Sequence, residues 1–531
     1  MNARILIADS IAQEGVDMLA AGADVDVRTG LAPAELLKII PAYDGLIVRS
    51  ETQVTADVFA AAKNLRVVGR AGVGVDNINI AAATERGIVV VNAPTGNTVS
   101  AAELAVALLM ALARNVSAAD ADLRGGAWRR KRFVGVELRD KTAGVVGLGQ
   151  VGSAVARRLK AMEMRVIAHD PFVPDERARV LGVELVDLDT LLQEADFITL
   201  HTTLAPGSPP LLGPEQFARV KEDVRLVNTA RGGLIDEAAL LEALESGRVA
   251  GAALDVFSTE PAVGNPLTTH PRVIATPHLG ASTQEAQERV ALDVAREVLA
   301  VLSGAPATTA VNAPLVDPES LEVLGPYLDV AHMVGTLVTQ LSEGQWRSIS
   351  IEYSGEISNH DVAPLKASAM AGLLATISEE HVNLVSVNNI IANRGWQVTE
   401  KKLPDAAPYT NLITTRLETA SGEVRIAGTL VHNEPRIVEI DGFRVDVSRG
   451  DHDHQHGHLL LLHNEDRPGR VGAVGITLGE MQVNISAMDV GKREEEGEAI
   501  MVLSVDRALN SSEIDRLTAI DGIEKVLQGE I

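Results

Sequence analysis

Short apolar runs alternate regularly with helical stretches over the first 280 residues of the chain. Alternation of strand and helix is typical of parallel sheets that carry helices on both faces. The apolar runs form two series, residues 4–9, 45–50, 65–72 and 87–94, then residues 142–149, 165–170, 196–202, 224–230, 251–257 and 273–278. We therefore expect two doubly wound α/β domains of the flavodoxin or Rossmann kind, the second with six strands.

The composition limits the classes of function that are open to the chain. Its 531 residues suggest about three or four domains. Its core must come from Ala, Val, Leu and Ile, because only 3% of the residues are aromatic. The net charge of -25 repels nucleic acid and anionic lipid, so neither nucleic acid nor a membrane is an expected partner. A small anionic substrate would need a local cluster of Arg or Lys.

The cysteine count and the apolar segments bear on location. The chain has no cysteine, which excludes disulfide and thiolate chemistry and gives secretion no support. The N-terminus lacks the long apolar stretch of a signal peptide. Residues 103–113 are the most apolar helix candidate, and they fall short of the ~20 residues that a membrane span needs. We therefore expect a cytoplasmic protein.

The chain changes character after residue 304. Residues 304–320 are rich in Pro, Ala and Thr and are interpreted as a linker, and residues 320–450 contain apolar–polar alternation that predicts an antiparallel sheet with one wet face. Residues 458–531 follow the order β-α-β-β-α-β of a ferredoxin-like unit. Histidine occupies every second position from His452 to His458. A transition-metal site is one interpretation of this spacing, but we favour a solvated linker and expect no metal.

A glycine-rich turn, Gly-Leu-Gly-Gln-Val-Gly, follows a predicted strand and opens a helix. Gly147 permits the tight turn, Gly149 lets the backbone approach a pyrophosphate, and Gly152 lets the helix pack on the strand. The helix N-terminus then offers amides and a positive dipole end to the phosphates. Asp170 ends the next strand, where its carboxylate would bond a ribose 2′-hydroxyl and repel a 2′-phosphate. The pattern predicts a dinucleotide site that prefers NAD to NADP.

Arg231, Glu260 and His278 each follow a predicted strand of the second series. Ligands of open α/β sheets collect at the carboxyl ends of strands, so we expect these side chains on one edge of the crevice. Hydride transfer from an alcohol needs a base for the hydroxyl proton, a cation for the carboxylate, and a group that orients the base. His278, Arg231 and Glu260 fit these roles in that order. Each residue alone is also compatible with an ordinary surface charge or loop position, so the prediction depends on their joint placement.

Six segments resemble the D-2-hydroxyacid dehydrogenase family in the order in which that family carries them. The resemblance implies that Arg231 binds the substrate carboxylate and carbonyl, that His278 is the proton donor and acceptor, and that Glu260 is its partner. The segments are GRAGVGVDNI (69–78), NAPTGNTVSAAELA (92–105), GVVGLGQVG (144–152), NTARGGLIDEAAL (228–240), DVFSTEP (255–261) and TPHLGASTQEA (276–286).

The same resemblance implies a set of contacts with NAD. These residues are Val73, Gly147, Gly149, Gln150, Val151, Gly152, Asp170, Thr202, Thr229, Ala230, Arg231, Asp255, His278, Leu279, Gly280 and Ala281. The loop of residues 201–213 departs from the family pattern, with Thr203 where Pro is common and Pro210 where Gly is common. Because of the second departure, the resemblance does not predict the backbone conformation of that loop.

The chain also resembles the long form of the phosphoglycerate dehydrogenases, which adds an intervening allosteric-substrate-binding domain and an ACT domain. This implies 3-phosphoglycerate as substrate and L-serine as an effector bound by Asn464, Asp466 and Asn484. Gln482 stands where a Gly usually precedes Val-Asn-Ile. The alternative for this unit is a dimerisation domain that binds nothing.

The substrate phosphate requires cations, and the chain offers two groups of them. Arg49 and Arg70 end strands of the first series. Residues 126–135 (GAWRRKRFVG) are the densest basic run, and the resemblance implies that Arg130 or Arg132 enters the site of a neighbouring subunit. A solvated helix end is the alternative for this run. The resemblance thus favours a homo-oligomer, with a tetramer as the expected state.

The expected organisation has four parts, residues 1–97 plus 285–317 (substrate binding), 98–284 (NAD binding), 318–455 (an α+β intervening domain) and 456–531 (ACT). The expected reaction is NAD-dependent oxidation of 3-phospho-D-glycerate to 3-phosphohydroxypyruvate, the first step of L-serine synthesis, with serine feedback. Two alternatives remain open. One is a reductase of glyoxylate, hydroxypyruvate or 2-oxoglutarate, and the other is an amino-acid-responsive binding protein with a silent dehydrogenase body.

Overall fold

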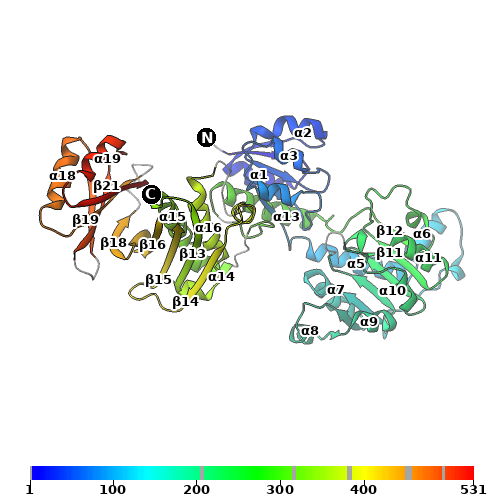
Figure 1. The fold of residues 1–531 in the computed structure, drawn as a ribbon. Coiled ribbons are helices and arrows are strands. Elements are labelled where there is room, and N and C mark those ends of the chain that lie inside the picture. Colours follow the sequence, from blue (N-terminus) through cyan, green and yellow to red (C-terminus); the bar gives the residue numbers. More distant parts are fainter. Residues whose placement is uncertain are drawn as a thin grey trace.

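The computed structural model describes residues 3–203, 208–305, 307–313, 318–378, 385–448, 457–492 and 497–530. The strands form four sheets, with five, seven, six and four strands in chain order. We call the corresponding units the N-terminal, second, third and C-terminal domains. They lie roughly in a row, with the C-terminal domain at one end, then the third and N-terminal domains, and the second domain at the other end (Figure 1).

The N-terminal domain is a parallel sheet in the order β2-β1-β3-β4-β5. The four predicted strands are present, and the edge strand β2 was not predicted. Its sequence Asp-Val-Asp-Val is only partly buried, so it lacks the continuous apolar run of its neighbours. The elements are β1 (Arg4–Ile7), α1 (Gln13–Gly22), β2 (Asp24–Val27), α2 (Pro33–Ile39), η1 (Ile40–Ala42), β3 (Gly45–Val48), α3 (Ala56–Ala61), β4 (Val67–Arg70), α4 (Ile80–Glu85) and β5 (Val89–Asn92).

The second domain is a parallel sheet in the order β12-β11-β10-β9-β6-β7-β8. The six expected strands are present, and β8, with two residues, is too short to leave an apolar signal. The order in which the chain adds strands to the sheet reverses between β6 and β9. Doubly wound sheets open a crevice for ligands at such a point. The elements are α5 (Thr98–Ala113), α6 (Val116–Arg124), η2 (Arg130–Arg132), β6 (Thr142–Val146), α7 (Gln150–Ala161), β7 (Arg165–His169), α8 (Asp175–Leu181), β8 (Glu184–Leu185), α9 (Leu188–Glu194), β9 (Phe197–Leu200), α10 (Pro214–Arg219), β10 (Val224–Asn228), η3 (Gly232–Leu234), α11 (Glu237–Glu245), β11 (Val249–Leu254), α12 (Pro266–Thr269) and β12 (Val273–Ala275).

Helix α13 (Gln284–Leu302) leaves the second domain and packs on α1, β4 and β5 of the N-terminal domain. Two glycines make this close approach possible. A methyl group built on Gly15 would lie 2.7 Å from the Cβ of Ala291, and one built on Gly69 would lie 2.5 Å from a methyl of Val294. Because α13 follows the His278 turn directly, its packing fixes that turn relative to the N-terminal sheet.

The third domain is a mixed sheet in the order β14-β13-β15-β16-β17-β18, in which only the β13–β14 pair is parallel. Its strands alternate buried and exposed residues, as in the pattern of β18, so the predicted wet face is present. The elements are α14 (Pro318–Leu324), α15 (Tyr327–Leu341), β13 (Trp346–Gly355), η4 (Glu356–Asn359), α16 (Ala363–Ala375), α17 (Val387–Asn393), β14 (Val398–Leu403), β15 (Asn411–Thr419), β16 (Gly422–Val431), β17 (Glu434–Ile440) and β18 (Phe443–Ser448).

The C-terminal domain is an antiparallel sheet in the order β20-β21-β19-β22, which confirms the ferredoxin-like prediction. Gln482 has a φ of 55°, in the left-handed region that favours glycine, so the turn before Asn484 keeps the backbone that the usual Gly would adopt. The elements are β19 (His458–Glu465), α18 (Arg470–Glu480), β20 (Ile485–Lys492), β21 (Glu498–Val505), α19 (Ser511–Thr518) and β22 (Ile523–Glu530).

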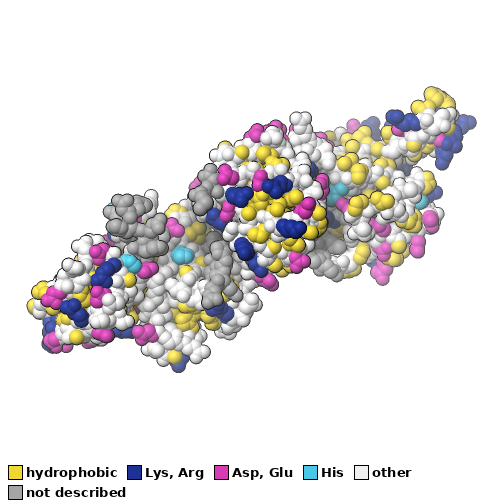
Figure 2. All heavy atoms as spheres, turned by 90° about the horizontal axis from the view of Figure 1, so that it is seen from above, with side chains coloured by type: hydrophobic (Ala, Val, Ile, Leu, Met, Phe, Trp, Pro, Cys, Tyr) yellow, Lys and Arg dark blue, Asp and Glu magenta, His cyan; other side chains and the backbone are white. Residues whose placement is uncertain are grey.

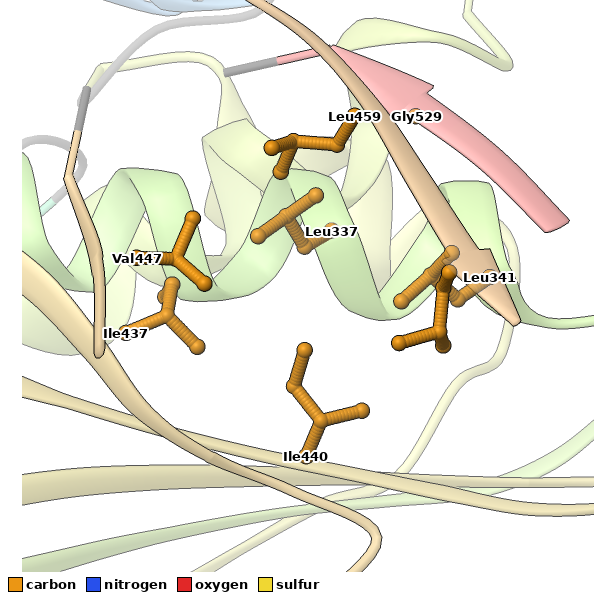
Figure 3. Close-up of a pocket in the computed structure, with 8 residues that line it drawn as sticks. Leu337, Leu341, Ile437, Ile440, Val447, Leu459 and Gly529 are labelled. Atoms are coloured by element: carbon orange, nitrogen blue, oxygen red, sulfur yellow. The ribbon is translucent and has the colours of Figure 1, made fainter. Parts of the chain in front are cut away.

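The third and C-terminal domains share one hydrophobic core. Leu459 and Leu461 of β19 pack in the same cluster as Leu337 and Leu341 of α15. Figure 3 shows the small apolar cavity at this junction, which Leu337, Leu341, Leu459 and residues of β17, β18 and β22 line. The side chain of Gln340 accepts a hydrogen bond from the backbone of β22 at 2.7 Å. The two domains therefore pack against each other through one continuous core.

Two further predictions concern membranes and metals. Among the described residues no single helix has both the length and the apolarity of a membrane span, whereas α5 and α6, bent by 64° at their break, meet both criteria when taken together. His452, His454 and His456 lie outside the described residues. His458 lies in β19, where its Nδ1 is 3.1 Å from a carboxylate oxygen of Glu530.

The crossing of α15 and α16 yields a stability prediction. A methyl group built on Gly372 would lie 2.1 Å from the backbone oxygen of His332. We expect Gly372→Ala to lower the stability of the third domain by about 1–3 kcal/mol, because the helices must move apart. The matched control is Gly475→Ala on α18, where the added methyl meets open space. Its expected effect is a gain of about 0.5–1 kcal/mol. Calorimetric unfolding of both variants checks this, and a Gly372→Ala protein as stable as the unchanged chain would contradict it.

Candidate active site

The glycine turn joins β6 to α7 and is shaped by contacts that exclude larger residues. Gly147 has a φ of 90°, and a methyl group on it would lie 2.5 Å from the backbone oxygen of His201. A methyl group on Gly152 would lie 1.9 Å from the backbone oxygen of Gly147. A methyl group on Gly149 would meet no atom within 4 Å, so the backbone there faces open space at the start of α7. This is the geometry that a pyrophosphate needs at a helix N-terminus.

Asp170 stands at the carboxyl end of β7, beside the glycine turn. One carboxylate oxygen accepts a hydrogen bond from the backbone of Leu148 at 2.8 Å, and the other accepts from the backbone of Phe172 at 2.9 Å. These bonds orient the carboxylate toward the turn and leave its remaining lone pairs for a ligand hydroxyl. A ribose 2′-hydroxyl partner at Asp170 stays a prediction, with which this orientation of the carboxylate is compatible.

The turn after β10 carries Thr229, Ala230 and Arg231, and Asn228 fixes its shape. The buried amide of Asn228 accepts a hydrogen bond from the backbone of Ala230 at 3.0 Å and donates one to the backbone oxygen of Arg231 at 2.8 Å. The hydroxyl of Thr229 is buried, and no described residue is its hydrogen-bond partner. A buried unpartnered hydroxyl at this edge fits a ligand that supplies the missing bond, so the residues fit a dinucleotide.

His278 and Glu260 form the hydrogen-bonded pair that the sequence predicted. The imidazole Nδ1 lies 2.7 Å from a carboxylate oxygen of Glu260, and the other oxygen of Glu260 accepts from the backbone of Phe257 at 3.0 Å. Both side chains are partly exposed, 48% for His278 and 37% for Glu260. Since Nδ1 faces the carboxylate, Nε2 is the nitrogen left to exchange a proton with a substrate.

The buried carboxylate of Asp255 holds the turn that carries His278. It accepts hydrogen bonds from the Thr276 hydroxyl at 2.6 Å, the Leu279 backbone at 2.7 Å and the Gly280 backbone at 2.9 Å. His278 has a φ of 55°, a left-handed conformation that is uncommon for residues other than glycine. Burial raises the pKa of Asp255, while these hydrogen bonds act in the opposite direction. Asp255 is fully engaged inside the protein.

Arg231 reaches from the second domain toward the N-terminal domain. Its Nη1 donates to its neighbour's backbone oxygen, that of Ala230, at 2.8 Å, and its Nε lies 3.2 Å from a carboxylate oxygen of Asp76. A methyl group on Gly74 would lie 2.1 Å from Nη2, so the guanidinium lies against the Gly74 backbone. A methyl group on the next residue, Gly232, would overlap the backbone of Phe257, in the loop that leads to Glu260. The Arg231 turn therefore adjoins the loop of the His278–Glu260 pair.

Arg49 and Arg70 lie close enough to Arg231 to form a cationic cluster with it. Burial lowers the pKa of Arg70 to about 10, and the positive charges of Arg231 and Arg49 contribute to that lowering. The Nε of Arg70 is buried without a partner among the described residues. Arg49 also lines a small pocket with Ala281 of the His278 turn and Gln287 of α13. A cluster of repelling cations with an unpartnered donor favours the binding of an anion.

The sequence predicted the three arginines, but it did not predict the residues that support them. The carboxylate of Asp9 accepts from the backbones of Arg49 at 2.6 Å and Thr52 at 3.1 Å, and the amide of Asn77 donates to the backbone oxygens of the same two residues. The loop from Arg49 to Thr52 is thus clamped from both sides. Asp9 ends a strand, which is the same signal that identified Arg231, Glu260 and His278. Nothing local marks Asn77 or Gln287.

The basic run of residues 126–135 does not join this site within one chain. Figure 1 shows α6, which precedes the run, on the side of the second domain away from the N-terminal domain. Figure 2 shows Lys and Arg side chains beside hydrophobic ones at that end of the molecule. Trp128 is 78% exposed and Val134 is 81% exposed, and the nearby helix α6 buries no residue. Arg130 and Arg132 are exposed in η2.

The three residues predicted for an effector lie at two ends of the C-terminal sheet. Asn464 pairs with Ala499, whereas the strand that follows Asn484 begins opposite Val505. Ala499 and Val505 are six residues apart on β21. At the rise of an antiparallel strand, Asn464 and Asn484 are therefore separated by roughly 20 Å along the strand direction. The side-chain oxygen of Asn464 is buried without a described partner, while Asp466 and Asn484 are exposed. Asn464 and Asn484 of one chain do not converge.

Three segments of the chain match known protein families. Residues 106–280 match the D-isomer specific 2-hydroxyacid dehydrogenase, NAD binding domain. Residues 323–441 match the D-3-phosphoglycerate dehydrogenase intervening domain, and residues 458–522 match the ACT domain. The second domain is therefore an NAD-binding domain. The third domain is an intervening domain, and the C-terminal domain is an ACT domain.

Relatives of similar length match almost the entire chain. D-3-phosphoglycerate dehydrogenase of Archaeoglobus fulgidus is 42% identical over 98% of both chains, and that of Bacillus subtilis is 41% identical over 98% of both. The structure of the TT0316 protein from Thermus thermophilus covers 58% of this chain and 99% of its own, with 38% identity and a TM-score of 0.54. A glyoxylate reductase from Paecilomyes thermophila covers 58% and 98%, with 30% identity and a TM-score of 0.54. The chain belongs to the D-3-phosphoglycerate dehydrogenase family of NAD-dependent D-isomer specific 2-hydroxyacid dehydrogenases.

Proposed function

We propose that this protein oxidises 3-phospho-D-glycerate to 3-phosphohydroxypyruvate with NAD, as the first step of L-serine synthesis. The observation that carries the proposal is the cluster of Arg49, Arg70 and Arg231 at the cleft edge that holds the His278–Glu260 pair. A substrate with a carboxylate at one end and a phosphate at the other matches such a cluster. Simple 2-oxoacids would leave part of it unpaired, which argues against a reductase of glyoxylate.

His278 is the proposed base. Glu260 accepts a hydrogen bond from Nδ1–H, which favours the neutral tautomer whose Nε2 lone pair is free for the substrate. When Nε2 takes the hydroxyl proton, the carboxylate 2.7 Å away stabilises the resulting imidazolium. Asp255 contributes indirectly by holding the turn in which His278 sits. The arrangement needs no movement of the imidazole relative to its carboxylate during the proton transfer.

The three arginines divide the substrate between them. Arg231 is the proposed ligand of the substrate carboxylate and of the oxygen that becomes the carbonyl, because its planar guanidinium can donate two parallel hydrogen bonds and its turn adjoins the loop that leads to Glu260. Arg49 and Arg70 are the proposed ligands of the phosphate, together with Gln287, which lines the pocket beside Arg49. Holding both ends of the substrate places its central carbinol carbon beside His278.

NAD, when bound, accepts the hydride from that carbon. The proposed contacts are the glycine turn with Gln150 and Val151 for the pyrophosphate and Asp170 for the ribose. Thr202, Thr229, Ala230, Val73 and residues 278–281 are the proposed neighbours of the nicotinamide half. For Thr229 the support is its buried unpartnered hydroxyl. For Asp255 the hydrogen bonds above favour a supporting role over direct contact.

We further propose a homo-oligomer, with a tetramer as the expected state. Trp128 and Val134 expose large apolar groups beside Arg130 and Arg132, a combination typical of protein interfaces. In an oligomer this surface can present Arg130 or Arg132 to the site of a neighbouring subunit.

The location that we expect, the cytoplasm, stays a prediction, as do the domain boundaries 1–97 plus 285–317, 98–284, 318–455 and 456–531.

We propose L-serine as an inhibitor that binds between two ACT domains. Because Asn464 and Asn484 lie at opposite ends of one sheet, a small ligand can touch both only when a second copy supplies one of them. The buried oxygen of Asn464, which lacks a described partner, supports a polar ligand at its end of the sheet. The shared core of the C-terminal and third domains would then carry the change toward the catalytic half.

Replacement of His278 tests its proposed role as the base. We expect His278→Ala to lower kcat for 3-phosphoglycerate by about 10²–10⁴-fold, because no other group takes the hydroxyl proton. NADH binding should change little. His270→Ala, on the loop before β12, is the control and should retain the activity. NADH formation assayed by absorbance, with 2-hydroxyglutarate as a comparison substrate, measures both; a His278→Ala enzyme with an unaltered turnover number would remove the residue from the mechanism.

The second prediction concerns the choice of dinucleotide. We expect Asp170→Ala to raise KM for NAD by about tenfold, the loss of one hydrogen bond to a charged group. KM for NADP should fall in the same variant, because the repulsion of its 2′-phosphate is gone. The exposed Asp175→Asn change, five residues later, controls for general charge. Identical NAD and NADP constants in the Asp170→Ala variant and the unchanged enzyme would rule out this role.

The third prediction concerns the effector. We expect Asn464→Ala and Asn484→Ala each to raise the L-serine concentration for half inhibition by at least tenfold, about 1.4 kcal/mol of lost binding. Ser512→Ala, exposed on α19, is the control. Mixing the two Asn variants should restore part of the inhibition, because some mixed dimers then carry one intact site. Full serine sensitivity in both single variants would contradict the proposed site.

A further inference from the structure

Two carboxylates, those of Asp9 and Asp76, act electrostatically on the arginine cluster, and both favour the charged form of Arg70. They differ in how firmly they are held. Asp9 is 2% exposed and accepts hydrogen bonds from the Arg49 backbone and from the backbone and hydroxyl of Thr52. Asp9 is thus buried and bonded to the loop that carries Arg49, and releasing it would break all three hydrogen bonds.

Asp76 is held much less firmly. Its side chain is 80% exposed, and within the described part of the chain its ion pair is the one with Arg231 Nε at 3.2 Å. An exposed ion pair of this kind contributes roughly 0.2–1 kcal/mol. The Asp76 carboxylate can therefore leave Arg231 at little cost whenever a better anion arrives.

The geometry places Asp76 where it competes for the guanidinium. Arg231 donates a hydrogen bond from Nη1 to the backbone oxygen of Ala230, and its Nε forms an ion pair with Asp76. A carboxylate that binds an arginine with both oxygens uses two neighbouring nitrogens, and Nε with Nη2 is one of the two available edges. A methyl group on Gly74 would lie 2.1 Å from Nη2 and 2.9 Å from the Asp76 oxygen, so Gly74 borders the same edge.

We propose that Asp76 is the exchangeable counter-ion of Arg231, which the substrate carboxylate replaces on binding and which recaptures Arg231 when the product leaves. The inference rests on the proposed role of Arg231 as the carboxylate ligand. Asp76 belongs to the N-terminal domain and Arg231 to the second domain, so the pair also spans the two domains that border the cleft. The pair opposes the binding of every anion at Arg231, substrate and product alike.

The competing account makes Asp76 a positioning residue that holds Arg231 throughout the reaction. The two accounts predict opposite signs. If Asp76 competes with the substrate, removing its charge tightens the binding of carboxylates. If Asp76 positions Arg231, removing its charge leaves the guanidinium less ordered, weakens the binding of carboxylates and lowers kcat/KM.

The test is Asp76→Asn in the full-length enzyme. We expect KM for 3-phosphoglycerate to fall by about two- to fivefold, the fold-change that corresponds to an exposed ion pair. The inhibition constant of 2-phosphoglycolate, which has both anionic groups but no carbinol to oxidise, should fall by a similar factor. The inhibition constant of inorganic phosphate should change less, because phosphate alone can occupy Arg49 and Arg70.

Two further variants make the result specific. Asp76→Glu keeps the carboxylate and should bring KM back toward that of the unchanged enzyme. Asp57→Asn removes an exposed charge from the start of α3 in the same domain and should leave KM unchanged. A rise in KM or in the 2-phosphoglycolate inhibition constant for Asp76→Asn would overturn the proposal, and so would a fall of equal size in Asp57→Asn.

A separate variant distinguishes this failure from failure of the proposed function. Arg231→Ala should raise KM for 3-phosphoglycerate strongly if Arg231 binds the carboxylate. An Arg231→Ala enzyme with unaltered KM would refute the role of Arg231 itself. A raised KM in Arg231→Ala together with no tightening in Asp76→Asn would refute only the exchange of counter-ions.

Discussion

The hydrogen bonds that the Asp255 carboxylate accepts from Thr276, Leu279 and Gly280 are the constraint on which the rest of the site depends. They hold a turn in which His278 has a left-handed backbone conformation, and that conformation aims the imidazole at Glu260. The same turn leads directly into α13, which packs through Gly15 and Gly69 onto the N-terminal sheet. One buried carboxylate thus links the base, the strand β11 and the helix that joins the two halves of the cleft.

Electrostatics divides the molecule into an acidic exterior and a local cationic cluster. The chain carries a net charge of -25, yet Arg49, Arg70 and Arg231 lie close enough that Arg231 and Arg49 depress the pKa of Arg70. Arg49 is kept in place through its backbone rather than through an ion pair, since Asp9 and Asn77 bind its loop through the main chain. This leaves the guanidinium donors available to an anion that enters the cleft.

The sequence was sufficient for those parts of the fold and site that local pattern encodes. The apolar runs identified the long parallel strands, and strand ends identified Arg231, Glu260 and His278, because parallel strands carry their C-terminal residues to one edge. Edge strand β2 and the two-residue β8 were not predicted because neither has a continuous apolar run. Asp9, Asn77 and Gln287 escaped for another reason. Their partners lie many positions away in the chain, so their roles exist only once the N-terminal sheet and α13 have come together. The opposite placement of Asn464 and Asn484 likewise depends on sheet register, which the motif alone does not specify.

We infer that His278, Glu260 and the three arginines act on one substrate held at both ends. A crystal structure of the enzyme with NADH and 3-phosphohydroxypyruvate tests it most directly. The account predicts the His278 Nε2 within about 3.2 Å of the substrate oxygen, the hydrogen-bond distance that proton transfer requires. It also predicts the carboxylate on Arg231 and the phosphate on Arg49 and Arg70. A phosphate bound elsewhere, or an imidazole turned away from the substrate oxygen, would contradict it.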